Sequence, residues 1–264
     1  MTIPKDIRES HPGLSDWSIL LGYRGSIAHG MYVPQSDPNS IDDKDIMSVC
    51  VPPLEYYFGL KQFGSRGTKE ISRAEWDIVI YEVKKFIGLL EKGNPNVLNM
   101  LWLQPEHYIY LTDEGRYLIE NRDVFTSKKA YRAFSGYAYG QLHRMEHANY
   151  QGYMGKKRKA IVDKHGYDTK NAAHLIRLLR MGTEFLNDGV LNVLRHDSTQ
   201  LLEIKRGEWT LEKVKREAER LFKRIDEAYD KSPLPVEPDR EKINRICIDI
   251  CVSRFKLTSA RGVL

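Results

Sequence analysis

The chain has 264 residues, of which 41% are hydrophobic and 29% charged, and its formal net charge is +5. This composition is typical of a folded globular protein and excludes a largely disordered chain. No apolar run approaches the roughly 18 residues of a membrane-spanning helix, the N-terminus lacks the apolar segment of a signal peptide, and three cysteines do not predict a disulfide framework. We therefore expect a cytoplasmic protein without a membrane partner.

The first hundred residues alternate between strand and helix patterns. An apolar run at 17–23, bounded by turn residues, predicts a buried strand. A second strand is predicted at 44–51, where two prolines end it, and a third at 76–80. Apolar residues at helical spacing follow, up to a Gly-Asn-Pro sequence at 93–95, which predicts a helix that ends there.

From about residue 96 onward, amphipathic helical patterns replace the strand patterns. The predicted helices cover 96–102, 113–121, 127–148, 170–187, 210–229 and 239–256. The expected fold class is therefore α+β, a small mixed sheet followed by an α-helical region. We place the division near residue 105, which gives an α/β domain at 1–105 and a helical domain at 106–264.

Gly25 and Ser26 directly follow the first predicted strand. A chain that turns from a strand into a short helix presents unpaired backbone N–H groups and, here, one hydroxyl, and such groups bind anions. The sequence therefore predicts a phosphate-binding turn, although an ordinary turn has the same signature.

Three carboxylates lie at or near the starts of the other two strands. Period-2 alternation places Asp43 and Asp45 on one side of the second strand and Lys44 on the other. Asp77 is the one acid within the apolar third strand, where an unpaired carboxylate is costly to bury. Such oxygen ligands suit Mg²⁺, which also binds substrate phosphates. Taken singly, the first two acids also fit a solvated acidic turn, and Asp77 a strand end.

The same motifs carry a family resemblance. The segment 25–30 (GSIAHG), the Asp-Lys-Asp sequence at 43–45 and Asp77 resemble the motifs of predicted nucleotidyltransferases with a DNA polymerase β-type catalytic core. Segments 127–145 and 171–189 resemble the helical half of that family's larger members. The resemblance implies that Asp43, Asp45 and Asp77 are catalytic and hold two Mg²⁺ ions, with Mn²⁺ as an alternative. It also implies that Gly25 and Ser26 bind the nucleotide's phosphates.

The resemblance further implies a reaction. A nucleotidyltransferase moves a nucleoside monophosphate from an NTP such as ATP to an acceptor hydroxyl and releases pyrophosphate. In two-metal catalysis, two carboxylates hold both ions and the third acts on the acceptor hydroxyl through its metal. Two alternatives are open: a non-catalytic RNA- or nucleotide-binding module that keeps the fold and uses only its basic face, and a metal-dependent phosphodiesterase that uses the same three acids.

The helical half carries the surplus of positive charge. Residues 1–100 hold eleven basic and thirteen acidic side chains, a net −2, so the remainder is +7; segment 128–180 alone has twelve basic and three acidic side chains, a net +9. Lys170, His174 and Arg177 recur at i, i+4 and i+7, so one helix face would present them to the nucleotide. An RNA 3′ end fits this basic region as the acceptor. Protein hydroxyls and small molecules are alternative acceptors. A basic face that is only solvated, with no ligand bound, is a further alternative.

Overall fold

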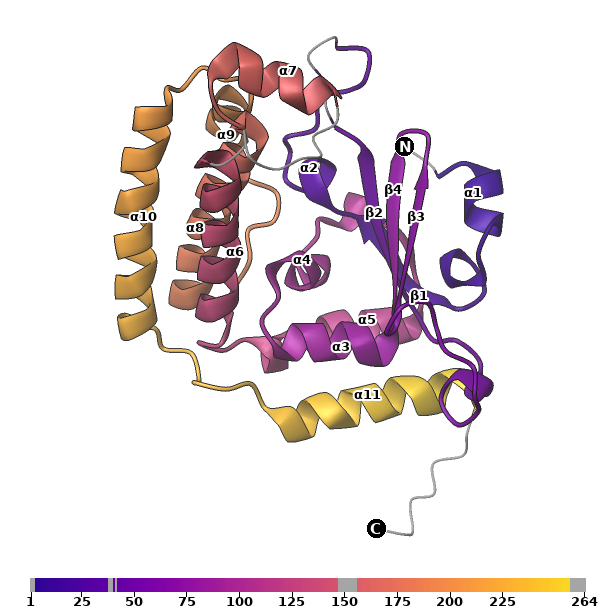
Figure 1. Ribbon diagram of the computed structural model, residues 1–264. Helices are drawn as coiled ribbons and strands as arrows, with labels where there is room; N and C mark the ends of the chain where they lie inside the picture. The colour runs from indigo at the N-terminus through magenta and orange to yellow at the C-terminus, as the bar shows by residue number, and fades with distance from the viewer. Residues whose placement is uncertain (1–2, 38–39, 41, 147–155, 257–264) are drawn as a thin grey trace.

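Five strands form one mixed sheet, drawn in indigo to magenta in Figure 1. The computed structural model describes residues 3–37, 40, 42–146 and 156–256. The strands are β1 (Ser18–Tyr23), β2 (Lys44–Cys50), β3 (Thr68–Arg73), β4 (Trp76–Glu82) and β5 (Tyr108–Leu111), in the order β3-β4-β2-β1-β5. Strands β2 and β4 are parallel and the other neighbours are antiparallel. The three predicted strands and the α+β class are confirmed.

The two edge strands, β3 and β5, were not predicted from the sequence. Strand β3 (TKEISR) is polar and largely exposed, because it pairs with β4 on one side and faces solvent on the other. Strand β5 has four half-buried residues and pairs with β1. It follows residue 105 in the chain and yet completes the sheet. The domain division near residue 105 stays a prediction.

Helices lie on both sides of the sheet, and on one side they continue into a bundle (Figure 1). They are α1 (Lys5–Glu9), α2 (Gly25–Ala28), α3 (Val83–Glu91), α4 (Pro95–Leu98), α5 (Asp113–Glu120), α6 (Ala130–Glu146), α7 (Lys156–His165), α8 (Thr169–Asp188), α9 (Ser198–Lys205), α10 (Leu211–Lys231) and α11 (Arg240–Arg254). Short 3₁₀ helices are η1 (Pro12–Leu14), η2 (Leu54–Tyr56), η3 (Asn99–Leu101), η4 (Pro105–His107) and η5 (Arg122–Phe125). Helix α8 packs between α6 and α10, and α11 returns to contact α3 and α5.

The helix predictions agree with these bounds at the longer amphipathic elements. The helix predicted at 96–102 is instead the short α4 followed by η3, and the end of the helix predicted at 127–148 lies outside the described residues. Helices α7 and α9 were missed. The first is a run of basic residues with a weak apolar stripe, and the second is only eight residues long.

A continuous apolar core joins the sheet to the bundle. Met47 and Val79 on one face of the sheet belong to the same buried cluster as Phe134 and Phe185 in the helices. The opposite face, with Ile46, Ile78 and their neighbours, packs in a smaller core with α1 and η1. Side chains alternate along a strand. The residues two positions before Met47 and Val79, which are Asp45 and Asp77, therefore point to the bundle side.

Candidate active site

The predicted phosphate-binding turn lies where β1 leads into α2. Gly25 has a φ of 61°, in the left-handed region that glycine adopts without strain. A Cβ atom at this position would overlap the carboxylate of Asp45. The hydroxyl of Ser26 is buried and has no hydrogen-bond partner among the described residues. At this turn the backbone of Gly25 therefore packs against the carboxylate of Asp45, and the hydroxyl of Ser26 is left available to a ligand.

Asp45 and Asp77 are direct neighbours across the sheet. They are register partners in the parallel pair β2–β4. The guanidinium of Arg24 lies beside both, with Nη2 3.0 Å from Asp77 Oδ2 and 3.6 Å from Asp45 Oδ1. The side chain of Asp45 is 25% exposed and that of Asp77 is 43% exposed. The two carboxylates thus share one cation of the protein, and Asp77 is the one more open to solvent.

The negative charge of an ionised Asp45 is only partly balanced by nearby positive charges. Burial raises its pKa to about 6; the charges of Arg24 and Lys170 act to lower this pKa, whereas those of Asp77 and Asp43 act to raise it further. A carboxylate whose ionisation is opposed by burial and by neighbouring acids gains from a bound cation. The donor chemistry at this position therefore fits a divalent metal ion.

Asp43 is placed differently from the other two acids. It precedes β2 by one residue and its side chain is exposed. Within the described ranges, no three His, Cys, Asp or Glu side chains form a group arranged to hold a metal ion. The fit to Mg²⁺ is therefore limited to the donor chemistry of the carboxylates and to the register of Asp45 with Asp77. Asp45 and Asp77 would hold an ion together only after the guanidinium of Arg24 has moved away from both carboxylates.

The lysine between the two acids of β2 faces away from them. Lys44 Nζ lies 2.5 Å from Glu75 Oε1 and 5.0 Å from the centre of the Trp76 ring. These partners precede and begin β4. The positive charge is thus neutralised locally, and Lys44 does not compete with a cation at Asp45.

A cavity of about 300 Å³ opens beside the turn and Asp45. Its lining includes all five residues predicted to bind the nucleotide, namely Gly25, Ser26, Lys170, His174 and Arg177. Asp45 also lines it, whereas Asp43 and Asp77 do not. The face of α8 expected from the i, i+4, i+7 spacing therefore meets the predicted phosphate-binding turn at one cavity. The roles of these residues stay predictions.

Arg177 is a buried cation at this cavity. It is 6% exposed, its Nη1 contacts the sulfur of Met181 at 3.3 Å, and its Nε has no hydrogen-bond partner among the described residues. Burial and the charge of Arg195 lower its pKa to about 10, so it stays charged at neutral pH. The charge of Asp197 acts to raise this pKa. No carboxylate of the described residues forms an ion pair with Arg177, and such a buried positive charge attracts an anionic ligand.

The turn is also fixed from the bundle side, through His29. Its Nδ1 lies 2.9 Å from the backbone oxygen of Val193 and must donate to it, because a carbonyl oxygen only accepts. Burial, together with the charge of Arg177, lowers the pKa of His29 well below its usual value, so the ring is neutral. The backbone N–H of Arg195 donates to His29 O at 3.4 Å. The loop 190–197 therefore holds the end of the turn.

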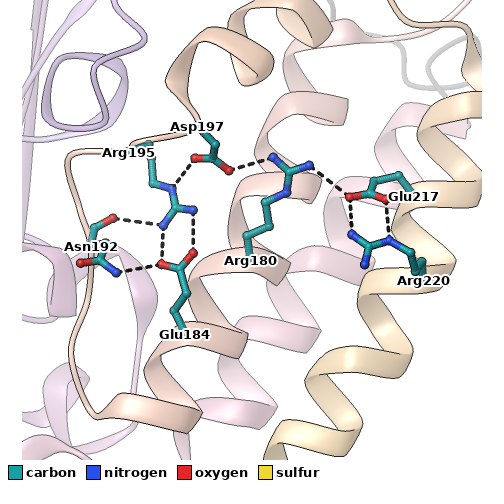
Figure 2. A network of polar contacts seen from close by, with 7 residues as sticks. All are labelled: Arg180, Glu184, Asn192, Arg195, Asp197, Glu217 and Arg220. Atoms are coloured by element: carbon teal, nitrogen blue, oxygen red, sulfur yellow. Dashed lines mark hydrogen bonds and ion pairs between the residues drawn. The ribbon is translucent and has the colours of Figure 1, made fainter.

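An ion-pair network positions that loop, as Figure 2 shows. The fully buried side chain of Arg195 donates to both carboxylate oxygens of Glu184, at 2.6 and 2.8 Å, and to Asp197 at 2.8 Å. Arg180 extends the network from Asp197 at 2.8 Å to Glu217 of α10 at 3.1 Å. Burial alone would raise the pKa of Asp197, but hydrogen bonds from the two arginines lower it. Helices α8 and α10 are thus linked to the loop behind the cavity.

A buried carboxylate that the sequence did not single out also lines the cavity. Asp42 is 2% exposed, accepts a hydrogen bond from Val33 N at 2.9 Å and pairs with Lys205 at the end of α9. Lys170 Nζ lies 4.0 Å from its other oxygen. In the sequence Asp42 is one of several adjacent acids, and no local pattern distinguishes the buried one. Arg24 was likewise missed, since its partners are distant in the chain.

Several basic and aromatic side chains of segment 128–180 form contacts within the helical region and are not available to a ligand. Lys129 pairs with Glu237 at 2.7 Å, and Arg180 belongs to the network of Figure 2. The ring of Tyr139 stacks on that of Phe222, with centroids 4.3 Å apart. Residues 147–155 of the segment lie outside the described residues. The basic charge available at the cavity is therefore smaller than the composition suggests.

A wider groove of about 880 Å³ adjoins the cavity and shares Asn96 and Tyr137 with it. Lys69 of β3, Lys85 of α3 and Tyr81 of β4 also line this groove. Basic and aromatic side chains along a groove suit a single-stranded nucleic acid, whose backbone is anionic and whose bases stack. No local pattern in the sequence predicts an acceptor site here.

Carboxylates on neighbouring strands, next to a glycine turn that opens on a basic cavity, define the chain as a polymerase β-like nucleotidyltransferase fold. Comparison with known families is more specific: a sequence model of RlaP, the RNA repair pathway DNA polymerase beta family, matches residues 18–249. The chain belongs to this family, which confirms the resemblance inferred from the motifs and supports nucleotidyltransferase activity in general. No curated protein and no solved structure matches the chain.

One expectation about membranes can be compared with the fold. Among the helices that the structure describes, none combines the length and the apolar character that crossing a bilayer requires.

Proposed function

We propose that the protein transfers a nucleoside monophosphate from an NTP to the 3′ hydroxyl of an RNA and releases pyrophosphate. The observation that carries this proposal is the cavity in which Gly25, Ser26, Lys170, His174 and Arg177 meet beside Asp45. Cationic and hydroxyl groups around one cavity suit a triphosphate. The RNA repair pathway of the family favours RNA over protein or small-molecule acceptors.

In this proposal the three acids have different roles. Asp43, Asp45 and Asp77 would hold Mg²⁺, or Mn²⁺ in its place, and the ions when bound supply charge stabilisation at the reacting phosphate. The bond between the acceptor oxygen and the α-phosphorus forms, and the bond from that phosphorus to the pyrophosphate oxygen breaks. Asp77, the more exposed carboxylate of the register pair, would orient the acceptor hydroxyl and take up its proton.

The groove supports an RNA acceptor that approaches from the β3–β4 side. It meets the cavity at Asn96 and Tyr137, so a strand lying along Lys69 and Lys85 would reach the nucleotide at that junction. This path differs from the helical face expected from the charge count. The basic face of α8 then serves the triphosphate.

The direct test measures NMP incorporation from labelled NTPs into an RNA with a 3′ hydroxyl. Asp45→Asn and Asp77→Asn should each abolish incorporation, and the same RNA with a blocked 3′ end should accept no label. Asp113→Asn is the matched control, because Asp113 is a fully exposed carboxylate on α5. Undiminished incorporation by both site variants would contradict the proposal, and label on protein or on a small molecule would reassign the acceptor.

A second candidate follows from Arg24, whose guanidinium lies between Asp45 and Asp77. A non-catalytic RNA- or nucleotide-binding module could keep this ion pair and use the cavity without a metal. It predicts nucleotide binding that does not respond to Mg²⁺ or to Asp77→Asn, together with no incorporation by the wild-type chain.

A further inference from the structure

Unpaired buried polar atoms gather at the cavity. In the described part of the chain, eight buried side-chain nitrogen or oxygen atoms have no hydrogen-bond partner. Four of these belong to residues that line this one cavity: Ser26 Oγ, Asn99 Oδ1, Gln141 Oε1 and Arg177 Nε. Buried polar groups are normally paired, and a concentration of exceptions indicates a ligand that pairs them. The cavity is therefore suited to a ligand with several polar groups.

The four atoms need two different kinds of partner. Arg177 Nε is a donor and the Ser26 hydroxyl can donate, so the oxygens of a phosphate chain satisfy both. Asn99 Oδ1 and Gln141 Oε1 are acceptors, which phosphate oxygens cannot satisfy. A ligand that pairs all four atoms therefore carries at least two hydrogen-bond donors in addition to its phosphate oxygens.

The two acceptors come from a part of the wall that is fixed in place. Asn99 begins η3 directly after α4 and is 6% exposed, and Gln141 lies on α6. Asn94, which caps α4, donates through Nδ2 to the hydroxyl of Tyr137 on α6 at 2.9 Å. Helices α4 and α6 are therefore tied together, and the positions of the two amide groups are coupled.

We propose that Asn99 and Gln141 bind the sugar hydroxyls of the nucleotide and make the site selective for ribonucleotides over 2′-deoxyribonucleotides. A ribose presents two adjacent hydroxyls, one for each amide oxygen, and a deoxyribose presents one. A hydroxyl both donates and accepts, so it pairs with either end of a side-chain amide. The inference rests on the proposed function, because it assumes that the phosphates of an NTP occupy the side of Ser26 and Arg177.

The experiment measures equilibrium binding to the full chain of ATP, 2′-deoxy-ATP and inorganic tripolyphosphate, with Mg²⁺ and without acceptor. ATP should bind roughly 10- to 100-fold more tightly than 2′-deoxy-ATP, because the deoxy sugar leaves one buried acceptor unpaired. Asn99→Ala and Gln141→Leu should each reduce ATP affinity toward that of 2′-deoxy-ATP and leave the affinity for tripolyphosphate unchanged.

Controls separate this effect from a loss of folding. Asn244→Ala and Gln200→Ala change exposed amides on α11 and α9 and should leave all three affinities unchanged. The unfolding temperature of each variant checks the fold, and Gln141→Leu remains informative if Asn99→Ala does not fold.

The possible failures are distinguishable. Equal affinity of the wild-type chain for ATP and 2′-deoxy-ATP, with tripolyphosphate still bound, overturns the sugar-binding role alone. If neither NTP nor tripolyphosphate binds, the proposed function itself fails.

Discussion

The α-carbon of Gly25 lies directly against the carboxylate of Asp45, so that a methyl group on the glycine would overlap Asp45 Oδ2. The contact joins two predicted motifs that are twenty residues apart. It depends on the antiparallel pairing of β1 with β2, which places the end of β1 beside the start of β2. The phosphate-binding turn and the acid therefore cannot move independently.

Gly25→Ala tests this contact. The new methyl group has to displace Asp45, and the φ of 61° is unfavourable for alanine. We expect NMP transfer to fall by about 100-fold, as is typical when a reacting group is displaced by about 1 Å. Unfolding in denaturant should show a loss of about 1–3 kcal/mol. Gly136→Ala on α6 is the control, because among the described residues no atom outside the adjoining helix backbone lies within 4 Å of the added carbon. It should be neutral or stabilising by about 0.5–1 kcal/mol.

Regular elements with a strong period were predictable from the sequence, whereas their neighbours in space were not. The apolar runs of β1, β2 and β4 and the stripe of α10 follow from local periodicity. The polar edge strand β3 has no such period. The register that sets Asp45 beside Asp77 depends on packing of the whole sheet, which no local pattern encodes.

In the site, too, local spacing could be predicted from the sequence and spatial neighbours could not. The spacing of Lys170, His174 and Arg177 correctly predicted a shared face, because helical geometry fixes it. The sequence does not single out Asn99 and Gln141, since an amide in a helical segment looks the same in the sequence whether it is solvated or buried without a partner. Burial of a polar atom is a property of the packed fold.

The ionisation of Asp45 should cost folding free energy at neutral pH. Its pKa in the folded chain is about 6, against 3.8 for the ordinary group. The folded state thus binds a proton that the unfolded state has released, and stability from this group falls as the pH rises from about 4 to about 6. In the presence of a chelator, Asp45→Asn should be more stable than wild type at pH 7.5 by up to about 3 kcal/mol. The difference should vanish near pH 4.

Chemical denaturation of both proteins across this pH range checks the prediction. Other carboxylates, such as Asp197, titrate in both proteins and cancel in the difference. Asp113→Asn gives the baseline for an exposed acid. An asparagine variant at position 45 that is no more stable than wild type at pH 7.5 would show that Arg24 compensates the charge fully.

Arg195 should contribute far more to stability than Arg220, although both belong to one network (Figure 2). Arg195→Met leaves Glu184 without its buried cation and Asp197 with Arg180 alone, and removing one member of a buried pair costs about 3–5 kcal/mol. Arg220 is 51% exposed, so Arg220→Met should cost at most about 1 kcal/mol. Thermal and denaturant unfolding measure both. Equal effects would mean that the network around the loop 190–197 is not what holds it.

The groove beside the cavity makes a prediction about salt. Lys69 and Lys85 line it, and each phosphate contact with a single strand contributes about 0.7 to the slope of log affinity against log salt concentration. Lys69→Gln combined with Lys85→Gln should therefore reduce that slope for single-stranded RNA by about 1.4. Lys223→Gln on the exposed face of α10 is the control and should leave the slope unchanged. If the control lowers the slope and the groove variant does not, the acceptor binds on the bundle and the path along β3 and α3 is wrong.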